Sequence, residues 1–213
     1  DTLIVGQFIG AGALAAVGSA YTLMVFLISI MLGLSMGSGT VFSLQYGAGQ
    51  MGALHRSIYV SSLLIGAVTF LLNLAAFLWL DPILRLLQVP QDIYAMMYNY
   101  LWIIFYGIPF TFIYNFYAAL LRAVGDAVTP LWFLAVSVVL NIGLDLFFIL
   151  RLGWGIEGAA IATVVAQGVS ALGIMGYTYI RCPELRLHRE DLRFDRKCLK
   201  EITSFSTLTC VQQ

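Results

Sequence analysis

Charged residues are scarce in this sequence. Only 10% of its 213 residues are Asp, Glu, Lys or Arg, whereas in soluble globular domains about a quarter are charged. Eleven basic residues balance eleven acidic ones, so the overall charge gives no support to a nucleic-acid-binding role. Hydrophobic residues make up 61% of the chain, and the mean hydropathy is +0.91. This composition predicts an integral membrane protein whose partner is the lipid bilayer.

Cysteine and histidine are also rare, which limits the chemistry open to the chain. The three cysteines, Cys182, Cys198 and Cys210, lack metal-ligand spacing, and His55 and His188 are the only histidines. We therefore expect unpaired thiols and no zinc or haem site. The sequence also lacks a nucleophile–base pair and a nucleotide-binding loop, so we predict no enzyme activity, no cofactor and no ATP-driven export.

Long uncharged runs define the expected membrane spans. They occupy residues 2–55, 57–80, 93–121, 127–144 and 158–180. Each is long enough, or nearly so, for a helix that crosses about 30 Å of hydrocarbon, and the spacing is wrong for a β-barrel. The first run would form a single helix about 80 Å long, so it must turn, and the Gly-rich residues 10–13 are the expected place.

These runs predict an all-α polytopic helix bundle with short polar connections. The expected spans are the end of a first helix in residues 1–9, then Leu14–Tyr46, Ser57–Leu80, Ile93–Leu121, Thr129–Leu150 and Ile156–Ile180. Residues 1–180 would form one transmembrane lobe, residues 181–201 a connector, and residues 202–213 the start of a seventh span. Since the chain opens on Asp1 directly before an apolar run, we read it as an excerpt of a longer protein.

The distribution of Lys and Arg predicts the orientation. Arg56, Arg122 and seven basic residues within 181–200 fall on one side of the expected zigzag, against Arg85 and Arg151 on the other. The positive-inside rule makes the first side cytoplasmic, in a cell inner (plasma) membrane. The connector mixes these basic residues with leucines, which favours an amphipathic segment on the membrane surface; a lipid-sensing switch is the alternative.

One carboxylate, Asp145, lies inside an expected span. It precedes Leu150 by five residues, which is about 7 Å from the outer end of the fifth helix. Intramembrane charges normally face a bundle interior or a water-filled cavity and mark ion pathways, although a carboxylate near the interface could simply be solvated. Asn141 shares its helical face, and Thr163 on the antiparallel sixth span reaches a similar depth. These three oxygen-bearing side chains form a candidate cation or proton site.

The fourth span is unusually polar and is interrupted by Pro109 beside Gly107. This pair predicts a kink and a hinge that bends between conformational states. Tyr100 suits an aromatic belt at the outer interface, whereas Asn115 lies deeper and suits an interior contact. In the second span Gly33 and Gly37 form a small-xxx-small spacing, which favours close helix packing, with a hinge as the alternative.

Six short motifs follow one another along the chain, and their order and spacing are informative. They are residues 1–6 (DTLIVG), 15–18 (AAVG), 45–49 (QYGAG), 121–126 (LRAVGD) followed by Thr129 and Pro130, 140–145 (LNIGLD) and 155–163 (GIEGAAIAT). In order and spacing the chain resembles the multidrug and toxic compound extrusion (MATE) transporters. The Asn-x-x-x-Asp of the fifth span is similar to the DinF-like branch.

The resemblance implies twelve spans in two six-helix lobes, of which this chain would be the amino-terminal lobe and would need the carboxy-terminal one as partner. It implies alternating access that exchanges Na⁺ or H⁺ for organic cations and other drugs. It places Asp1, Asn141, Asp145 and Thr163 at the family's cation site, with Tyr100 and Asn115 as polar residues of the lobe cavity.

Two other functions stay open at this point. Related folds export or flip lipid-linked or metabolic intermediates. A non-transporting membrane subunit that serves only in assembly belongs to a different class. The assembly role needs no intramembrane carboxylate, so Asp145 argues against it.

Overall fold

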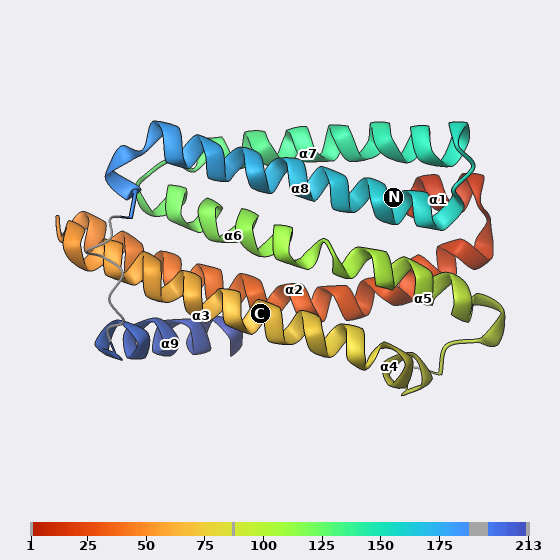
Figure 1. Ribbon diagram of the computed structural model, residues 1–213, viewed down its shortest axis with the longest axis horizontal. Helices are drawn as coiled ribbons and strands as arrows, with labels where there is room; N and C mark the ends of the chain where they lie inside the picture. Colours follow the sequence, from red (N-terminus) through yellow and green to blue (C-terminus); the bar gives the residue numbers. More distant parts are fainter. Residues whose placement is uncertain (1, 87, 188–195, 212–213) are drawn as a thin grey trace.

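Helices make up nearly all of the chain in the computed structural model, which describes residues 2–86, 88–187 and 196–211. In chain order the elements are α1 (Thr2–Phe8), α2 (Ala11–Gly47), α3 (Met51–Leu78), α4 (Leu80–Leu86), α5 (Gln91–Phe105), α6 (Ile108–Ala123), α7 (Val128–Leu146), the π-helical turn η1 (Phe147–Arg151), α8 (Gly155–Arg181), the 3-10 turn η2 (Pro183–Leu185) and α9 (Arg196–Val211). The long helices lie roughly parallel or antiparallel to one another (Figure 1).

The long helices are apolar enough to cross a membrane. Four helical segments are long and apolar enough to span a membrane: α2, α3, α7 with η1, and α8. The bent pair of α5 and α6 forms a fifth span if the two helices are counted as one. The predicted all-α membrane bundle is therefore confirmed. Arg56, Arg122 and Arg181 belong to the ends of helices that gather at the left of Figure 1, which we call the predicted cytoplasmic end.

Two breaks position the outer half of the bundle. Between α1 and α2 the chain turns at Gly10, whose φ of 116° favours glycine because a side chain would be strained there. Helix α2 begins at Ala11, slightly earlier than the predicted Leu14. Between α5 and α6 the axis bends by 44° at Tyr106 and Gly107. Pro109 lies in the first turn of α6, where it lacks the N–H that would continue the hydrogen bonding of α5.

The connection between the third and fourth spans differs from the sequence prediction. The expected spans end at Leu80 and resume at Ile93, which leaves residues 81–92 as a short polar connection, whereas Leu80–Leu86 forms the short helix α4. Pro82 lies in the first turn of α4, where the missing N–H costs nothing, so this proline is compatible with the start of a helix. Leu80 and Leu84 are buried on one face of α4.

The fifth span begins and ends with distinct local structure. The Asp126 carboxylate accepts a hydrogen bond of 3.0 Å from the N–H of Thr129, which caps the start of α7. At the other end, α7 widens into η1 at Phe147–Arg151. Such π-helical turns are frequent at functional sites, and this one directly follows the helix that carries Asp145.

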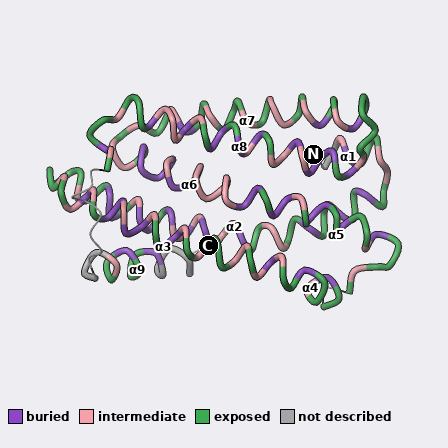
Figure 2. The backbone as a smooth tube through the Cα atoms, viewed as in Figure 1, coloured by how far each residue is buried: buried purple, intermediate pink, exposed green. Residues whose placement is uncertain are grey.

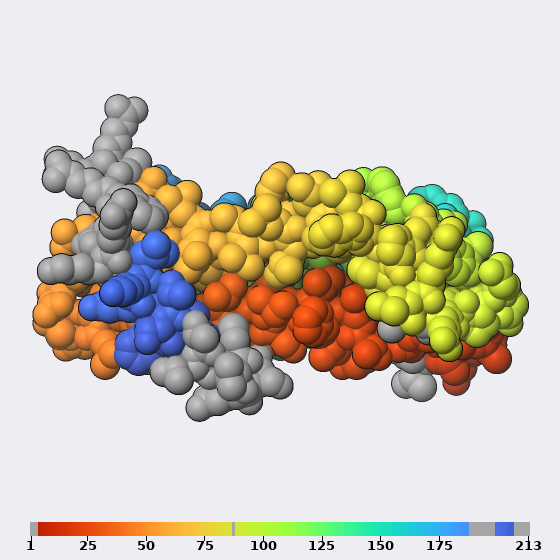
Figure 3. Space-filling model, turned by 90° about the horizontal axis from the view of Figure 1, so that it is seen from below, coloured from red at the N-terminus to blue at the C-terminus, as the bar shows by residue number. Residues whose placement is uncertain are grey.

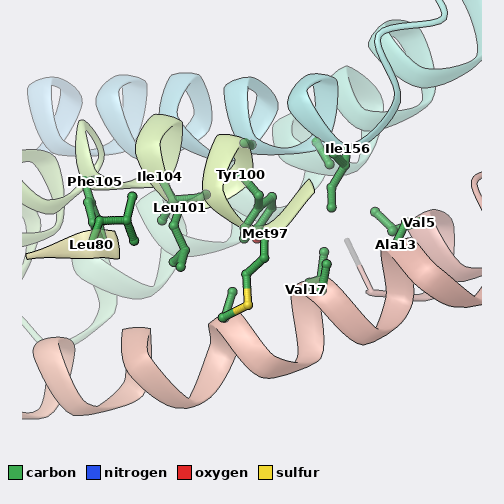
Figure 4. Close-up of a cluster of buried hydrophobic side chains, with 14 of the residues drawn as sticks. Val5, Ala13, Val17, Leu80, Met97, Tyr100, Leu101, Ile104, Phe105 and Ile156 are labelled. Carbon is green, nitrogen blue, oxygen red and sulfur yellow. The ribbon is translucent and has the colours of Figure 1, made fainter. Parts of the chain in front are cut away.

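The core divides between the two halves of the bundle. In the outer half, α5 packs between α2 and α8, with Met97 and Tyr100 between Val17 and Ile156 (Figure 4). Towards the predicted cytoplasmic end, a second cluster joins α2, α3 and α6 through Phe42, Ile58 and Phe116. Figure 2 shows that buried residues concentrate on these central helices, whereas α7 is largely exposed along its length.

Helix α9 packs across α2 and α3 near the predicted cytoplasmic end (Figure 3). Ile202 and Ser206 are buried in this contact, and the Ser206 hydroxyl donates a hydrogen bond of 3.3 Å to the carbonyl of Leu34. A Cβ at Gly37 would overlap the backbone of Ser206, so glycine permits this close approach. Because α9 begins at Arg196, residues 196–201 of the predicted connector are helical. The domain boundaries at 180 and 201 stay predictions.

Candidate functional site

A series of side-chain hydrogen bonds joins α7 to α8. The hydroxyl of Ser170 donates to the carbonyl of Phe133 over 3.1 Å, and Ser137 donates to the carbonyl of Ala166 over 3.1 Å. One turn further along α7, the amide of Asn141 donates to the hydroxyl oxygen of Thr163 over 3.3 Å. The contacting α7 positions are four residues apart, so they lie on one face of α7, and this face contacts α8 at each successive helical turn.

Small residues on α8 allow the two helices to approach. Gly158, Ala159, Ala160, Ala162 and Ala166 are all buried. Without large side chains at these positions, polar groups of α7 reach the backbone of α8 directly. Thr163 also donates to the carbonyl of Ala159 over 3.0 Å, so its hydroxyl is oriented by its own helix while it accepts from Asn141.

Asp145 continues the same face of α7, one turn beyond Asn141. Its side chain is 0% exposed, and within α7 only Pro130 and Asp145 are buried. The side chain is therefore enclosed by protein rather than solvated at the interface. The carboxylate lies close enough to the Tyr100 hydroxyl of α5 for the two groups to interact electrostatically. An ionised carboxylate in such a place is costly unless a cation or a proton neutralises it.

The predicted site residues fall into three groups. The structure brings Asn141 and Thr163 into contact, and it places Asp145 on the adjoining turn of α7, within electrostatic range of Tyr100. Asp1, the fourth predicted cation ligand, lies outside the described residues.

Two neighbouring cavities lie between the helices beside this site. The outer cavity, of about 360 Å³, lies between α2, α5 and α8, and Tyr100 and Thr163 line it. The inner cavity, of about 320 Å³, lies towards the predicted cytoplasmic end, and Asn115 and Ser137 line it. Tyr100 and Asn115, the two predicted cavity residues, thus line different cavities.

Gln167 is a cavity residue that the sequence analysis missed. It follows Thr163 by one helical turn and lines both the outer and the inner cavity. Its carboxamide oxygen lies against Gly107, at the break between α5 and α6. A Gln in the middle of an apolar span, four residues after a candidate ligand, was a signal that could have indicated it.

The donor set suits a hard monovalent cation or a proton. Carboxylate, hydroxyl and amide oxygens are the available ligands, and Na⁺ prefers oxygen. Within the described part of the chain, no group of three or more His, Cys, Asp or Glu side chains is placed to hold a metal ion. This arrangement differs from a transition-metal site, which would need imidazole or thiolate ligands.

Comparisons with known proteins agree with this architecture. The MatE family model matches residues 1–147. The probable multidrug resistance protein YpnP of Bacillus subtilis (strain 168) is 37% identical over 172 residues, which are 81% of this chain and 39% of that protein. YoeA of the same organism, also a probable multidrug resistance protein, is 35% identical over 201 residues, 91% of this chain and 41% of its own length. The FAD transporter of Shewanella oneidensis is 26% identical over 188 residues, 84% of this chain and 40% of that protein.

Solved structures show the same fold. An outward-facing multidrug resistance MATE family transporter of the MOP superfamily superimposes with a TM-score of 0.91 at 23% identity, over 99% of this chain and 47% of that one. The inward-facing conformation of a multidrug resistance MATE family transporter of the MOP superfamily superimposes with a TM-score of 0.92 at 23% identity, over 98% of this chain and 48% of that one. The chain thus spans about two fifths of the curated relatives named here and about half of the solved chains. The members of the matched family are membrane transporters and not enzymes, and the chain belongs to the MatE family.

Proposed function

We propose that the protein is a secondary active antiporter that exports drugs or other organic cations in exchange for Na⁺ or H⁺, and that this chain supplies its cation site. The observation that carries the proposal is the burial of Asp145 on a helix that otherwise exposes its length. A carboxylate at 0% exposure inside a membrane span, one turn from the Asn141–Thr163 contact, is typical of a cation or proton pathway.

The coupling follows from the position of the site beside the cavities. Thr163 belongs both to the contact with Asn141 and to the wall of the outer cavity. A cation or proton that enters from outside would neutralise Asp145 and change the spacing of α7 and α8. Because α8 also carries Gln167, that change would reach the wall of both cavities. The residues Asp1, Asn141, Asp145 and Thr163 form the proposed ligand set.

The cavities suit organic substrates that are recognised without an ion pair. Their lining combines aromatic rings, such as Tyr21 and Tyr114, with the neutral polar groups of Asn115 and Gln167. Aromatic faces attract organic cations, and amides and hydroxyls provide hydrogen bonds. The neutral charge of both linings leaves the carboxylate of Asp145 to the coupling ion.

A second candidate is the export of a metabolic or lipid-linked intermediate. The specific observation in its favour is the similarity to the FAD transporter of Shewanella oneidensis at 26% identity. The same ion-coupled mechanism would then act on a larger, polar cargo. Competition of flavin nucleotides with a fluorescent organic cation in the transport assay below separates the two candidates.

The decisive experiment measures gradient-driven transport by the full-length protein in proteoliposomes. Asp145→Asn keeps the size of the side chain and one acceptor oxygen but removes its charge. We expect it to abolish efflux of a fluorescent organic cation under imposed Na⁺ and pH gradients while expression and drug binding stay close to wild type. Asp92→Asn, at an exposed carboxylate in the first turn of α5, is the matched control and should transport normally. Wild-type efflux by Asp145→Asn under both gradients would refute the proposed coupling site.

A further inference from the structure

A third cavity, away from the candidate site, opens between the predicted cytoplasmic ends of α6 and α8. This groove of about 460 Å³ is the largest described here, and the segment after η2 closes one side of it. Its lining is mainly apolar, with a single charged residue at one end; it includes Ile58, Leu120, Met175, Leu185, Arg186 and Leu187. The ends of α6 and α8 that border the groove lie at the left of Figure 1.

Long-range contacts hold the groove open in a defined shape. His55, near the start of α3, forms a hydrogen bond of 2.6 Å between its Nε2 and the carbonyl of Glu184. Leu185 is buried at 5% exposure in the core cluster of α2, α3 and α6. These two contacts fix η2 against α3, so the wall that continues to Leu187 is preformed.

The guanidinium of Arg186 provides the charged end of the groove. Its Nε donates a hydrogen bond of 2.7 Å to the carbonyl of Tyr179, and its guanidinium carbon lies 4.6 Å from the centre of the Tyr179 ring. Within the described part of the chain, these contacts use one of its five N–H donors and one face of the group. The terminal amino groups keep donors for an anionic oxygen, and the fork geometry of arginine suits phosphate.

The groove reaches from the predicted cytoplasmic surface part of the way into one leaflet of a bilayer. From Met175 to Arg181, where α8 ends, is six residues, or about 9 Å along the helix. The groove therefore runs from the level of the lipid headgroups into the hydrocarbon. A ligand that satisfies both ends has an anionic head and an apolar tail. A small soluble anion would leave the apolar lining unused, and an uncharged lipid would leave Arg186 unused.

We propose that this groove binds an anionic phospholipid of the cytoplasmic leaflet, with its phosphate on Arg186 and an acyl chain along Met175 and Leu120. The positive charge of Arg186 favours an anionic headgroup, and the apolar lining of the groove favours an acyl chain. Basic pockets between transmembrane helices on the cytoplasmic side are typical binding places for such headgroups. The inference does not depend on the proposed transport, because lipid binding is measured without a gradient or a drug.

The test compares lipids with identical acyl chains on the full-length protein in detergent. Native mass spectrometry with phosphatidylglycerol and phosphatidylcholine should show retention of the anionic lipid only. Arg186→Gln should weaken phosphatidylglycerol binding by about tenfold, as expected for the loss of charge-assisted hydrogen bonds. Arg151→Gln, at an exposed arginine at the opposite end of the bundle, is the control and should bind as wild type.

A second variant tests the apolar part of the groove. Gly176 lines it, and a Cβ at this position would meet no atom within 4 Å, so Gly176→Leu extends a larger apolar side chain from an open position of the groove wall. We expect an unchanged unfolding temperature and lost phosphatidylglycerol binding. Equal retention of both lipids, unchanged binding by Arg186→Gln, or displacement of the lipid by inorganic phosphate alone would each overturn the proposal. So would absence of lipid binding by the wild-type protein, which would indicate that another part of the same protein fills the groove.

Discussion

The carboxamide oxygen of Gln167 lies directly against Gly107, so that a Cβ at position 107 would overlap it. The contact joins the middle of α8 to the 44° bend between α5 and α6. It also places the predicted hinge beside a side chain that lies one turn from Thr163. The bend is thereby connected to the helix that carries Thr163 of the candidate cation site.

The first prediction tests this contact by adding a single methyl group. Gly107→Ala should destabilise the folded protein by about 1 kcal/mol, because the flexible end of Gln167 has to swing away from the added methyl group. The carbonyl of Ile104, 3.0 Å from the added Cβ, also crowds this site. The measurement is the midpoint of thermal unfolding in detergent. In the double variant Gly107→Ala with Gln167→Ala, the part of the loss that is due to Gln167 should be recovered, whereas the crowding by the Ile104 carbonyl remains.

Gly143→Ala supplies the control for that series. A Cβ at Gly143, within α7, meets no atom within 4 Å, so alanine should leave stability unchanged or raise it slightly. If Gly107→Ala is as stable as Gly143→Ala, the contact with Gln167 does not constrain the bend. Pro109→Ala then tests separately whether the bend moves. If Pro109 and Gly107 form a hinge, this variant should reduce the transport rate more than it reduces the stability of the fold.

The contacts of Gln167 and Gly107 show where sequence reasoning ends. Uncharged runs bounded by Arg56, Asp92 and Arg122 were enough to predict the spans, because burial in lipid imposes the same composition on every residue of a span. The bend at Gly107 follows from the chemistry of Pro109, which is local. Which side chain fills the space beside Gly107 is decided by the packing of α8, about sixty residues further along the chain.

The candidate site likewise has one part that the sequence could predict and one part that depends on tertiary packing. Helix depth alone grouped Asn141, Asp145 and Thr163, since it depends only on the rise per residue. Sequence could not decide whether Asp145 is solvated or enclosed, because that depends on which neighbours cover the end of α7. Likewise the packing of Ser206 on Gly37 joins residues 169 positions apart, so the small-residue pattern around Gly37 predicted close packing without naming a partner.

The second prediction concerns the contact between Asn141 and Thr163. Thr163→Val keeps the shape of the side chain but removes the oxygen that accepts from the Asn141 amide. Interhelical hydrogen bonds of this kind in membranes contribute about 0.6 kcal/mol on average, so the expected loss of stability is small. Transport should suffer far more, because the proposed ligand set loses an oxygen.

Thr163→Ser and Thr40→Val are the comparisons for this prediction. Serine keeps the hydroxyl and should restore most of the transport. The Thr40 hydroxyl bonds the carbonyl of Met36 within its own helix, away from the site, so its loss should leave transport intact. The readout is the Na⁺ or H⁺ dependence of efflux in proteoliposomes. Normal ion dependence in Thr163→Val would remove this residue from the ligand set.

The third prediction concerns the packing of α9 on α2. Gly37→Val places branched atoms where the backbone of Ser206 lies, so α9 has to move away from α2. Cleavage by trypsin after Lys200, within α9, should become faster because the helix loses its support. Gly18→Val is the control on the same helix, since a Cβ at Gly18 meets no atom within 4 Å. Equal cleavage rates in the two variants would contradict the proposed role of Gly37.

The fourth prediction uses the acidity of Cys182, which follows the last residue of α8. Partial burial, then the charges of Glu184 and Asp126, raise the pKa of its thiol. A raised pKa means that less thiolate is present at neutral pH, and the thiolate is the form that reacts with alkylating reagents. With Cys198→Ser and Cys210→Ser in place, alkylation of Cys182 should therefore be slow at pH 7 and should accelerate at a higher pH than for an ordinary cysteine.

Removing the charge of Glu184 distinguishes electrostatics from simple burial in this reaction. Glu184→Gln takes away one negative neighbour, so the thiol pKa should fall and the pH profile of the alkylation rate should shift to lower pH. The plateau rate at high pH, which reports access of the reagent to the sulfur, should not change, because the glutamine side chain has nearly the same size. If the profile stays in place while the plateau changes, access rather than charge controls Cys182, and the assigned influence of Glu184 is wrong.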